Sequence, residues 1–330
     1  MESSLIILNS NLSKKTSKFW DKNKEKIEKH FSSAEIFILD LIEPQQKIDL
    51  NSYKTIIIIG DDLFFNHVIN FFFPCITNQS IAFLPDSNDS SICCGLNYPP
   101  RLSKKLELIK SNNYIPLDII KSHYINKNGL PDSCIILNDI LIGIPPLKIP
   151  LFFRTIMQWA RSSSIIPFTR SPNHITLVQG GKNLYSGRYL LGLILLGNKI
   201  TDGPKIRNKN RFNISKFDYF QLNTQFASNM KISLANLFSW VENPKQQNIF
   251  HKKINDLEIK AIGNENNIIA DGIHIGRLPA SFTILPKALN VISPLNVLKL
   301  SKPWKNPLGT TADIPSPIGN RDCFREEKLN

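Results

Sequence analysis

The stretch "IIIIGDDLFFNHVIN", residues 56–70, joins an apolar run to a sharp acidic turn and then to a second apolar segment. Four isoleucines in succession predict a strand that is buried on both faces, as in a parallel sheet. The segment 63–73 predicts a helix that is stopped by Pro74. Because phosphate-binding α/β proteins place their ligand at such a turn, Asp61 and Asp62 mark a nucleotide site, the remnant of one, or an ordinary helix cap.

The first 125 residues repeat this alternation of strand-like and helix-like patterns. Short apolar runs occur at 5–8, 34–41 and 80–85, and a lysine-rich helical pattern fills 13–31. Apolar strands separated by helices favour a parallel sheet that is covered on both faces. We therefore expect an N-terminal three-layer α/β domain of the nucleotide-binding type over residues 1–125.

From about residue 126 the pattern changes to short β-rich runs separated by turn residues. Examples are "SCIILNDILIGI" (133–144), "HITLVQGGKN" (174–183) and "SFTILPKALNVI" (281–292). Helical patterns near 151–163 and 226–241 interrupt these runs. We expect a C-terminal β-sandwich-like domain over 126–298, a cleft between the two domains, and an irregular proline-containing tail over 299–330.

The composition is that of a folded protein with an excess of positive charge. Of 330 residues, 42% are hydrophobic and 20% are charged, and the net charge is +13. Such a charge favours polyanions, and an anionic membrane surface or lipid is preferred here because no aromatic-glycine motif for nucleic acid accompanies it. No apolar run reaches the roughly 20 residues of a transmembrane helix. Five cysteines, an odd number, and an N-terminus without a signal pattern predict free thiols in the cytoplasm.

Three polar loops are expected at one edge of the predicted parallel sheet. They begin at Asn9, at Gly60 and at Pro85, each directly after a strand candidate. Ligands of open α/β sheets bind beyond the carboxyl ends of the strands. The loops therefore predict a site without reference to any family.

Three motifs carry a resemblance to a known family. "GDDLFFNHVIN" (60–70) is similar to a GGDGT turn followed by a helix of the pattern l-n-e-v-v-n, and "PDSNDSSICCGLNYP" (85–99) is similar to a P-l-G-T-x-N-D loop. "ADGIHIGRLPASFTILPKALNVISP" (270–294) is similar to a v-D-G-E turn followed by a p-x-a-l-x-v strand. In order and spacing over residues 4–294, the sequence resembles the diacylglycerol kinase and sphingosine kinase family of lipid kinases.

The resemblance implies ATP-dependent phosphorylation of a lipid hydroxyl, with Mg²⁺ as the metal. It places Asp62 at the catalytic centre and on Mg²⁺, and it places Asp271 and Gly272 in the substrate cleft. His274, one position beyond a lost acidic residue, is a candidate surrogate base. The residues that the resemblance puts around the nucleotide are Asn9, Gly60, Asp61, Asn66, Pro85, Ser87 and Asn88.

The departures from the family pattern predict weak or lost kinase activity. Asp61 and Leu63 replace glycines that let the backbone approach phosphate, and Phe64 replaces a threonine. Ile273 stands in place of the acidic residue after D-G, and the loss of a general base costs about 10²- to 10⁴-fold in rate. The family's D-D-G metal turn aligns with 213–215, which reads Asn-Ile-Ser. The alternative is a non-catalytic regulatory protein that binds lipid or a membrane surface peripherally from the cytoplasm.

Overall fold

The strand with four isoleucines is the centre of a parallel sheet. It spans Thr55–Gly60 (β3), and all six of its residues are buried. It pairs in parallel with β1 (Ser4–Asn9) on one side and with β4 (Ser80–Pro85) on the other, and β1 pairs in parallel with β2 (Glu35–Leu39). A central strand has no solvent-facing side, which explains its unbroken apolar sequence.

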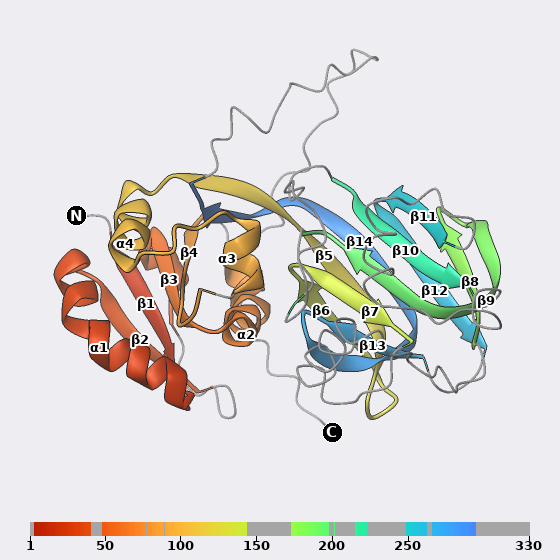
Figure 1. Ribbon diagram of the computed structural model, residues 1–330, viewed down its shortest axis with the longest axis horizontal. Coiled ribbons are helices and arrows are strands. Elements are labelled where there is room, and N and C mark those ends of the chain that lie inside the picture. The colour runs from red at the N-terminus through yellow and green to blue at the C-terminus, as the bar shows by residue number, and fades with distance from the viewer. Residues whose placement is uncertain are drawn as a thin grey trace, which may run out of the picture.

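Helices cover both faces of this sheet (Figure 1). Helices α1 (Lys14–His30) and α4 (Leu102–Ser111) pack on the face that carries Ile6 and Leu8. Helices α2 (Asp62–Phe72) and α3 (Ser91–Gly95) pack on the opposite face. This arrangement confirms the predicted three-layer α/β fold, and we call it the α/β unit.

The structure is a computed structural model, and the chain is described in nine parts. They are residues 3–40, 48–76, 78–88, 90–143, 173–197, 201, 215–223, 249–262 and 266–294. The predicted helices near 151–163 and 226–241 and the predicted tail over 299–330 lie outside these ranges. Two short 3-10 helices complete the α/β unit, η1 (Leu50–Ser52) and η2 (Phe73–Cys75).

The second unit, which we call the β unit, is built from antiparallel strands. They are β5 (Tyr114–Asn126), β6 (Pro131–Ile136), β7 (Asp139–Ile142), β8 (Asn173–Gln179), β9 (Lys182–Leu195), β10 (Phe217–Asn223), β11 (Ile249–Ile254), β12 (Asp256–Ile262), β13 (Asn267–Ala270) and β14 (Ile273–Ile292). Strand pairing closes on itself in the order β14, β12, β8, β9, β7, β13 and back to β14. The long strand β9 pairs with β7, β8 and β10, and β14 pairs with β5, β12 and β13, which gives the β-rich second unit that the sequence predicts.

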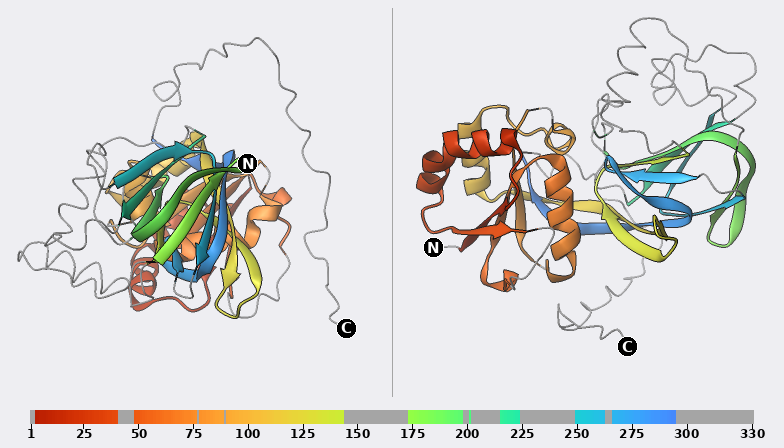
Figure 2. Two further views of the ribbon diagram at one scale, coloured as in Figure 1. Left: turned by 90° about the vertical axis from the view of Figure 1, so that its right-hand side faces the viewer. Right: turned by 90° about the horizontal axis from the view of Figure 1, so that it is seen from below.

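Two long strands join the units, as Figure 2 shows in its right-hand view. Strand β5 pairs with β14 from Tyr114–Ile292 at one end to Asn126–Gly276 at the other. The last residues of β14 also pair in parallel with β4, through Asn290–Ser80. One sheet therefore continues from the α/β unit into the β unit, and the domain boundaries at 125 and 298 stay predictions.

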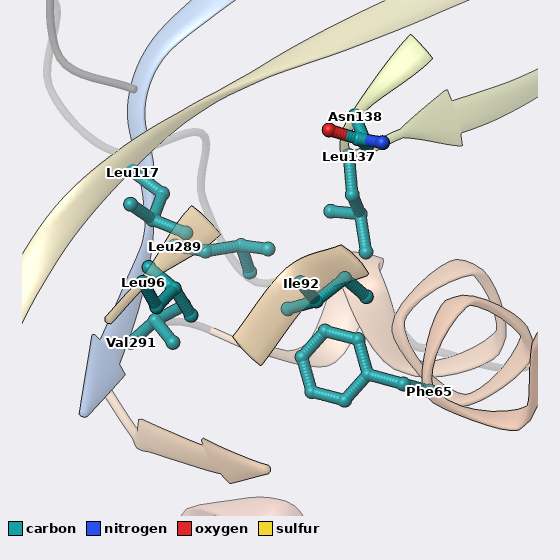
Figure 3. Close-up of a pocket in the computed structure, with 8 residues that line it drawn as sticks. All are labelled: Phe65, Ile92, Leu96, Leu117, Leu137, Asn138, Leu289 and Val291. Carbon is teal, nitrogen blue, oxygen red and sulfur yellow. The ribbon is translucent and has the colours of Figure 1, made fainter. Parts of the chain in front are cut away.

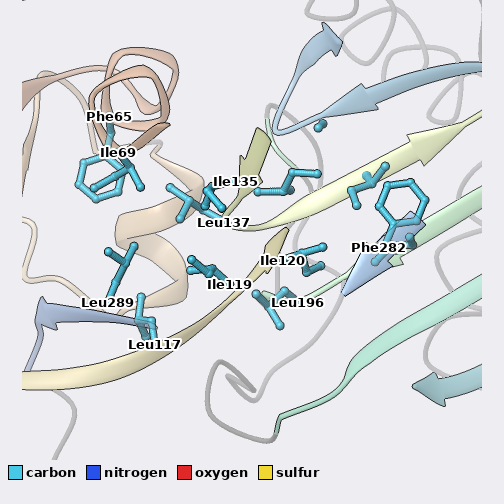
Figure 4. Close-up of a cluster of buried hydrophobic side chains, with 14 of the residues drawn as sticks. Phe65, Ile69, Leu117, Ile119, Ile120, Ile135, Leu137, Leu196, Phe282 and Leu289 are labelled. Carbon is cyan, nitrogen blue, oxygen red and sulfur yellow. The ribbon is translucent and has the colours of Figure 1, made fainter. Parts of the chain in front are cut away.

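An apolar core also runs from one unit to the other (Figure 4). Phe65 and Ile69 of α2 lie on one side of it, and Ile135 and Leu137 of the β unit lie on the other. All four side chains are buried. The two units consequently share packed side chains as well as strands.

Two observations concern the thiols and the helices of the described residues. Cys75, Cys93, Cys94 and Cys134 are free thiols. Among the helices that the structure describes, none combines the length and the apolar character that crossing a bilayer would take.

Truncating Phe65 to Ala should lower the free energy of unfolding by about 3–5 kcal/mol, because its buried ring lies 4.5 Å from the ring of Phe83 and a cavity would remain. Phe71→Ala on the exposed side of the same helix is the matched control and should cost less than about 1 kcal/mol. Urea denaturation measures both. Equal losses for the two variants would contradict the packing described above.

Candidate functional site

The acidic turn after β3 begins helix α2. Asp61 is the N-cap residue, and its Oδ1 accepts a hydrogen bond of 2.8 Å from the backbone N–H of Phe64. A carboxylate at this position satisfies an otherwise unpaired helix N–H and opposes the positive end of the helix dipole. The sequence left open whether Asp61 belongs to a nucleotide site, to the remnant of one or to a helix cap. In the structure Asp61 is a helix cap.

Asp62 points toward the start of helix α3. Its Oδ2 accepts hydrogen bonds from the backbone N–H of Ser91 (2.6 Å) and from the Ser91 hydroxyl (2.5 Å), and its Oδ1 accepts one from the Ser90 hydroxyl. Ser90 is itself the N-cap of α3, where its Oγ accepts from Cys93 N–H at 3.0 Å. Both oxygens of Asp62 are thus bound to the loop that precedes α3. Burial raises the pKa of Asp62 above its usual value, and the hydrogen bonds from Ser90 and Ser91 partly offset that rise.

Gly60 is required by a close approach of a side chain. A Cβ atom at this position would lie 2.8 Å from Cδ1 of Phe64. Phe64 is buried in the core, whereas Leu63 is 45% exposed. Of these two apolar residues, Phe64 thus contributes to the packed core, and Leu63 is largely exposed to solvent.

The loop after β4 is connected to two other helices. Asp86 Oδ2 accepts a hydrogen bond of 2.7 Å from the Thr16 hydroxyl in the first turn of α1, and its Oδ1 lies 3.6 Å from Lys15 Nζ. Asn88 Oδ1 accepts a hydrogen bond of 3.2 Å from Lys105 Nζ, on α4. Burial lowers the pKa of this lysine. Together with Ser90 and Ser91, these residues bind the loop to α1, α2 and α4.

The predicted nucleotide residues at the sheet edge therefore lie in neighbouring loops. Gly60 and Pro85 are register partners at the ends of β3 and β4, and Ser87 lies in the loop just described. Asn9 closes its own turn, with Oδ1 accepting from Asn11 N–H at 2.9 Å. Nucleotide binding by these residues stays a prediction.

Asn66 is a buried residue of α2, and its side chain contacts the β unit. Its Nδ2 donates to Asp271 Oδ2, and its Oδ1 accepts from Asn70 Nδ2. The Asn70 amide in turn pairs with the backbone of Ile135, accepting from its N–H (2.6 Å) and donating to its carbonyl (2.9 Å). Two predicted motif asparagines thus form a hydrogen-bonded chain between the units.

Asp271 and Gly272 form the two-residue turn between β13 and β14. Both have positive φ, +46° and +82°, which a turn of this kind needs and which Asp-Gly accommodates well. The turn directs the Asp271 carboxylate into the protein. Besides Asn66, it binds the backbone N–H groups of three successive residues: Leu137 (2.7 Å), Asn138 (2.9 Å) and Asp139 (3.0 Å).

A second buried carboxylate, Asp139, adjoins Asp271. The backbone N–H of Asp271 donates to the Asp139 carbonyl at 2.9 Å, and Asp139 Oδ1 accepts from the hydroxyl of Thr201 at 2.6 Å. Burial, followed by repulsion from Asp139, raises the pKa of Asp271 to about 7, against the three backbone hydrogen bonds, which lower it. Sequence reasoning missed Asp139, because nothing local distinguishes it from a surface turn residue.

His274 lies at the start of β14, half-buried, with Nε2 3.1 Å from the carbonyl of Gly276. Burial and the nearby Lys127 lower its pKa, so that it is largely neutral at pH 7. No contact links it to Asp62 or Asn66 among the described residues. Its role as a surrogate base stays a prediction.

Asp118 is a second residue that the sequence did not single out. It binds Ser215, the last residue of the segment that aligns with the D-D-G turn, and Lys287 of β14. Its Oδ2 accepts from the backbone N–H of Ser215 at 2.6 Å, and its Oδ1 accepts from that of Lys287 at 2.9 Å. Within the described parts of the chain, no group of three or more acidic, histidine or cysteine side chains is arranged to hold a metal.

A small cavity lies between the units among the described residues (Figure 3), and the predicted cleft between the domains stays a prediction. Its volume is about 10 Å³, enough for roughly one water molecule. The lining residues are Phe65, Ile92, Leu96, Leu117, Leu137, Asn138, Leu289 and Val291. Seven of the eight are apolar, so the cavity could admit apolar groups but offers few polar partners.

Comparison with known proteins identifies the fold. No protein-family model and no curated protein matches the sequence. Among solved structures, a diacylglycerol kinase from Bacillus anthracis superposes with a TM-score of 0.62 at 16% identity, covering 88% of this chain and 96% of that one. The protein has the fold of the diacylglycerol kinases.

Two further structures agree with this assignment. A second Bacillus anthracis structure of the same kind gives a TM-score of 0.65 at 15% identity, covering 88% of this chain and 96% of that one. Yeast NADH kinase in complex with NADH gives 0.51 at 8% identity, covering 88% and 82%. The lipid-kinase resemblance seen in the sequence is confirmed at the level of the fold, and activity is a separate question.

Asp62→Ala should destabilise the protein by about 2–3 kcal/mol, because it leaves a backbone N–H and two hydroxyls at the start of α3 without their acceptor. Asp61→Ala removes only an exposed cap and should cost about 1 kcal/mol. Chemical denaturation of the two neighbouring variants compares them directly. A larger loss for Asp61 would show that the carboxylates have the opposite roles.

Proposed function

We propose that the protein is a lipid-kinase-fold protein in which phosphoryl transfer is weak or lost and which binds an anionic lipid surface. The observation that carries the proposal is the position of Asp62. The resemblance assigns this residue to ATP and Mg²⁺, yet both of its oxygens accept hydrogen bonds from Ser90 and Ser91. Three of the roughly four acceptor sites of this carboxylate are therefore already filled by donors of the chain.

The surrounding loops support the same conclusion. Nucleotide phosphates need free backbone N–H groups and positive charge. Here Asp62 accepts from the backbone N–H of Ser91 at the start of α3, and Asp86 accepts from the Thr16 hydroxyl and lies near Lys15 on α1, so carboxylates of the chain already use donors and positive charge that a phosphate would need. Two further negative charges at this edge of the sheet would repel a polyphosphate.

The acceptor side of the reaction also lacks a base. Ile273 cannot accept a proton from a lipid hydroxyl, and Asp271 is engaged by four donors at the contact between the units. Phosphoryl transfer relies on positioning and charge neutralisation, so a slow residual rate is compatible with this arrangement.

Purified protein with labelled ATP, Mg²⁺ and vesicles containing diacylglycerol or sphingosine should show no transfer above the rate without protein. ATP with Mg²⁺ should likewise leave the melting temperature unchanged within about 1 °C, since bound ligand would stabilise the folded state by about 2.7 kcal/mol at a hundredfold excess over Kd. Asp62→Asn is the diagnostic variant. Transfer by the unchanged protein that this variant abolishes would overturn the proposal and assign a working kinase.

The lysines of α1 supply a surface for anionic lipid. Five exposed lysines recur at intervals of three and four residues and so lie along one face of the helix, away from the buried Trp20 and Ile27. They are Lys15, Lys18, Lys22, Lys26 and Lys29. Each basic residue near an anionic membrane contributes about 1 kcal/mol of attraction.

Changing Lys18, Lys22 and Lys26 together to Gln should weaken binding to vesicles of anionic phospholipid at least roughly tenfold, because three of these attractions are removed. The matched control changes Lys121, Lys182 and Lys253, three exposed lysines of the β unit, and carries the same net charge. Co-sedimentation at 0.1 M salt measures both. Equal weakening of both variants would indicate an effect of net charge and refute a surface on α1.

A further inference from the structure

The lysines of α1 that face away from the sheet form a continuous row. We define the lysine row as four exposed residues: Lys18, Lys22, Lys26 and Lys29. At 3.6 residues per turn they lie within an arc of about 80°, and at 1.5 Å per residue they extend over about 17 Å. In the described parts of the chain, no carboxylate lies within ion-pair distance of any of the four. Lys15 and Lys24 of the same helix, by contrast, are paired with acids.

The apolar side of α1 is already used by the protein's own core. Ile27 is fully buried and Trp20 is 8% exposed, and both pack in one cluster with Ile6 and Leu8 of the sheet. This helix has no large hydrophobic side chain among the exposed ones. A helix that inserts into a bilayer needs its apolar face free. Since α1 could free that face only by leaving the sheet, it offers a membrane its lysines alone.

We propose that the lysine row binds an anionic bilayer flat and without insertion, contacting several singly charged lipid headgroups at once. This mode of binding rests on the proposed function, because it takes the anionic lipid surface as the partner. Charge complementarity supplies the attraction, since the row adds four exposed positive charges to a chain whose net charge is +13. The surface is then held by its charge density, and neither one headgroup nor the hydrocarbon interior is needed.

A single headgroup with several phosphates does not fit the lysine row. Such a headgroup is bound where basic side chains converge on it. The row is straight and about 17 Å long, and its side chains point outward from the convex surface of a helix. Lysine is also a point charge on a flexible stem, without the fork by which arginine binds two phosphate oxygens. Each lysine of the row therefore contacts its own headgroup.

Two exposed isoleucines on the same face of the sheet are the alternative contact with a bilayer. Ile36 and Ile38 of β2 are 39% and 59% exposed, and they are in register with Ile6 and Leu8 of β1, on the face that α1 covers. They lie at the level of the sheet, whereas the lysine row lies on the far side of a helix that is about 10 Å thick. A flat surface that touches the row therefore leaves both isoleucines in water.

Vesicle binding of the full chain at two salt concentrations tests the proposal. Neutral phospholipid vesicles carrying phosphatidylserine or, at equal charge, phosphatidylglycerol should bind with the same affinity within about threefold. Vesicles carrying phosphatidylinositol bisphosphate at the same total charge should stay within that range. Raising the salt from 0.1 to 1 M shortens the screening length from about 10 Å to about 3 Å and should abolish binding.

Two double variants locate the contact on the row. Lys22→Gln with Lys26→Gln should weaken binding at 0.1 M salt about 25-fold, since each lysine near an anionic surface contributes about fivefold. Lys104→Gln with Lys110→Gln is the control with the same net charge, on α4, which covers the same face of the sheet. It should weaken binding less than about threefold. Equal weakening by the two variants would overturn the proposal.

Ile36→Ser with Ile38→Ser should bind vesicles as the unchanged protein does. Binding that survives 1 M salt, that exceeds the threefold range for bisphosphate vesicles, or that this variant abolishes would overturn the flat mode while leaving lipid binding itself established. Absence of binding to every anionic vesicle would overturn the lipid surface of the proposed function as well. Tighter binding of a nucleic acid duplex than of vesicles at the same salt would assign the row to another partner and so contradict the proposal.

Discussion

The buried carboxylate of Asp271 is the constraint on which the contact between the two units depends. A carboxylate removed from water has to have its oxygens filled by donors, and the structure supplies four. Three come from consecutive peptides at the β6–β7 turn, and one comes from α2. Asp271 and its neighbour Gly272 both have positive φ, and the tight turn that they form points the carboxylate inward.

The same use of carboxylates recurs at the edge of the parallel sheet. Asp62 binds the start of α3, and Asp86 binds the first turn of α1. At α3 the carboxylate accepts from a backbone N–H at the start of the helix, and at α1 it accepts from a side-chain hydroxyl, so both carboxylates use donors that an anion could use. These carboxylates connect the loops after β3 and β4 to the neighbouring helices.

Local patterns predicted the parallel sheet but not the connections between the units. Strands β3 and β4 match their sequence boundaries, because each is a short run of buried residues with no polar alternation. The full lengths of β5 and β14 could not be foreseen, since their pairing joins residues 150 or more positions apart. The same limit applied at the site: Asn66 was recognised as a motif residue, but its partner Asp271 is 205 residues away.

The internal use of aspartates also shapes the outer surface. Asp118, Asp139, Asp218 and Asp271 are all buried, whereas the seven lysines of α1 are exposed. Negative charges held inside by donors are partly neutralised where they lie, so the solvent-facing charge on α1 has few acids to balance it. Such a field reaches about 8 Å at physiological salt, enough to attract an approaching anionic surface. The lysine face of α1 therefore concentrates positive charge on the surface of the α/β unit.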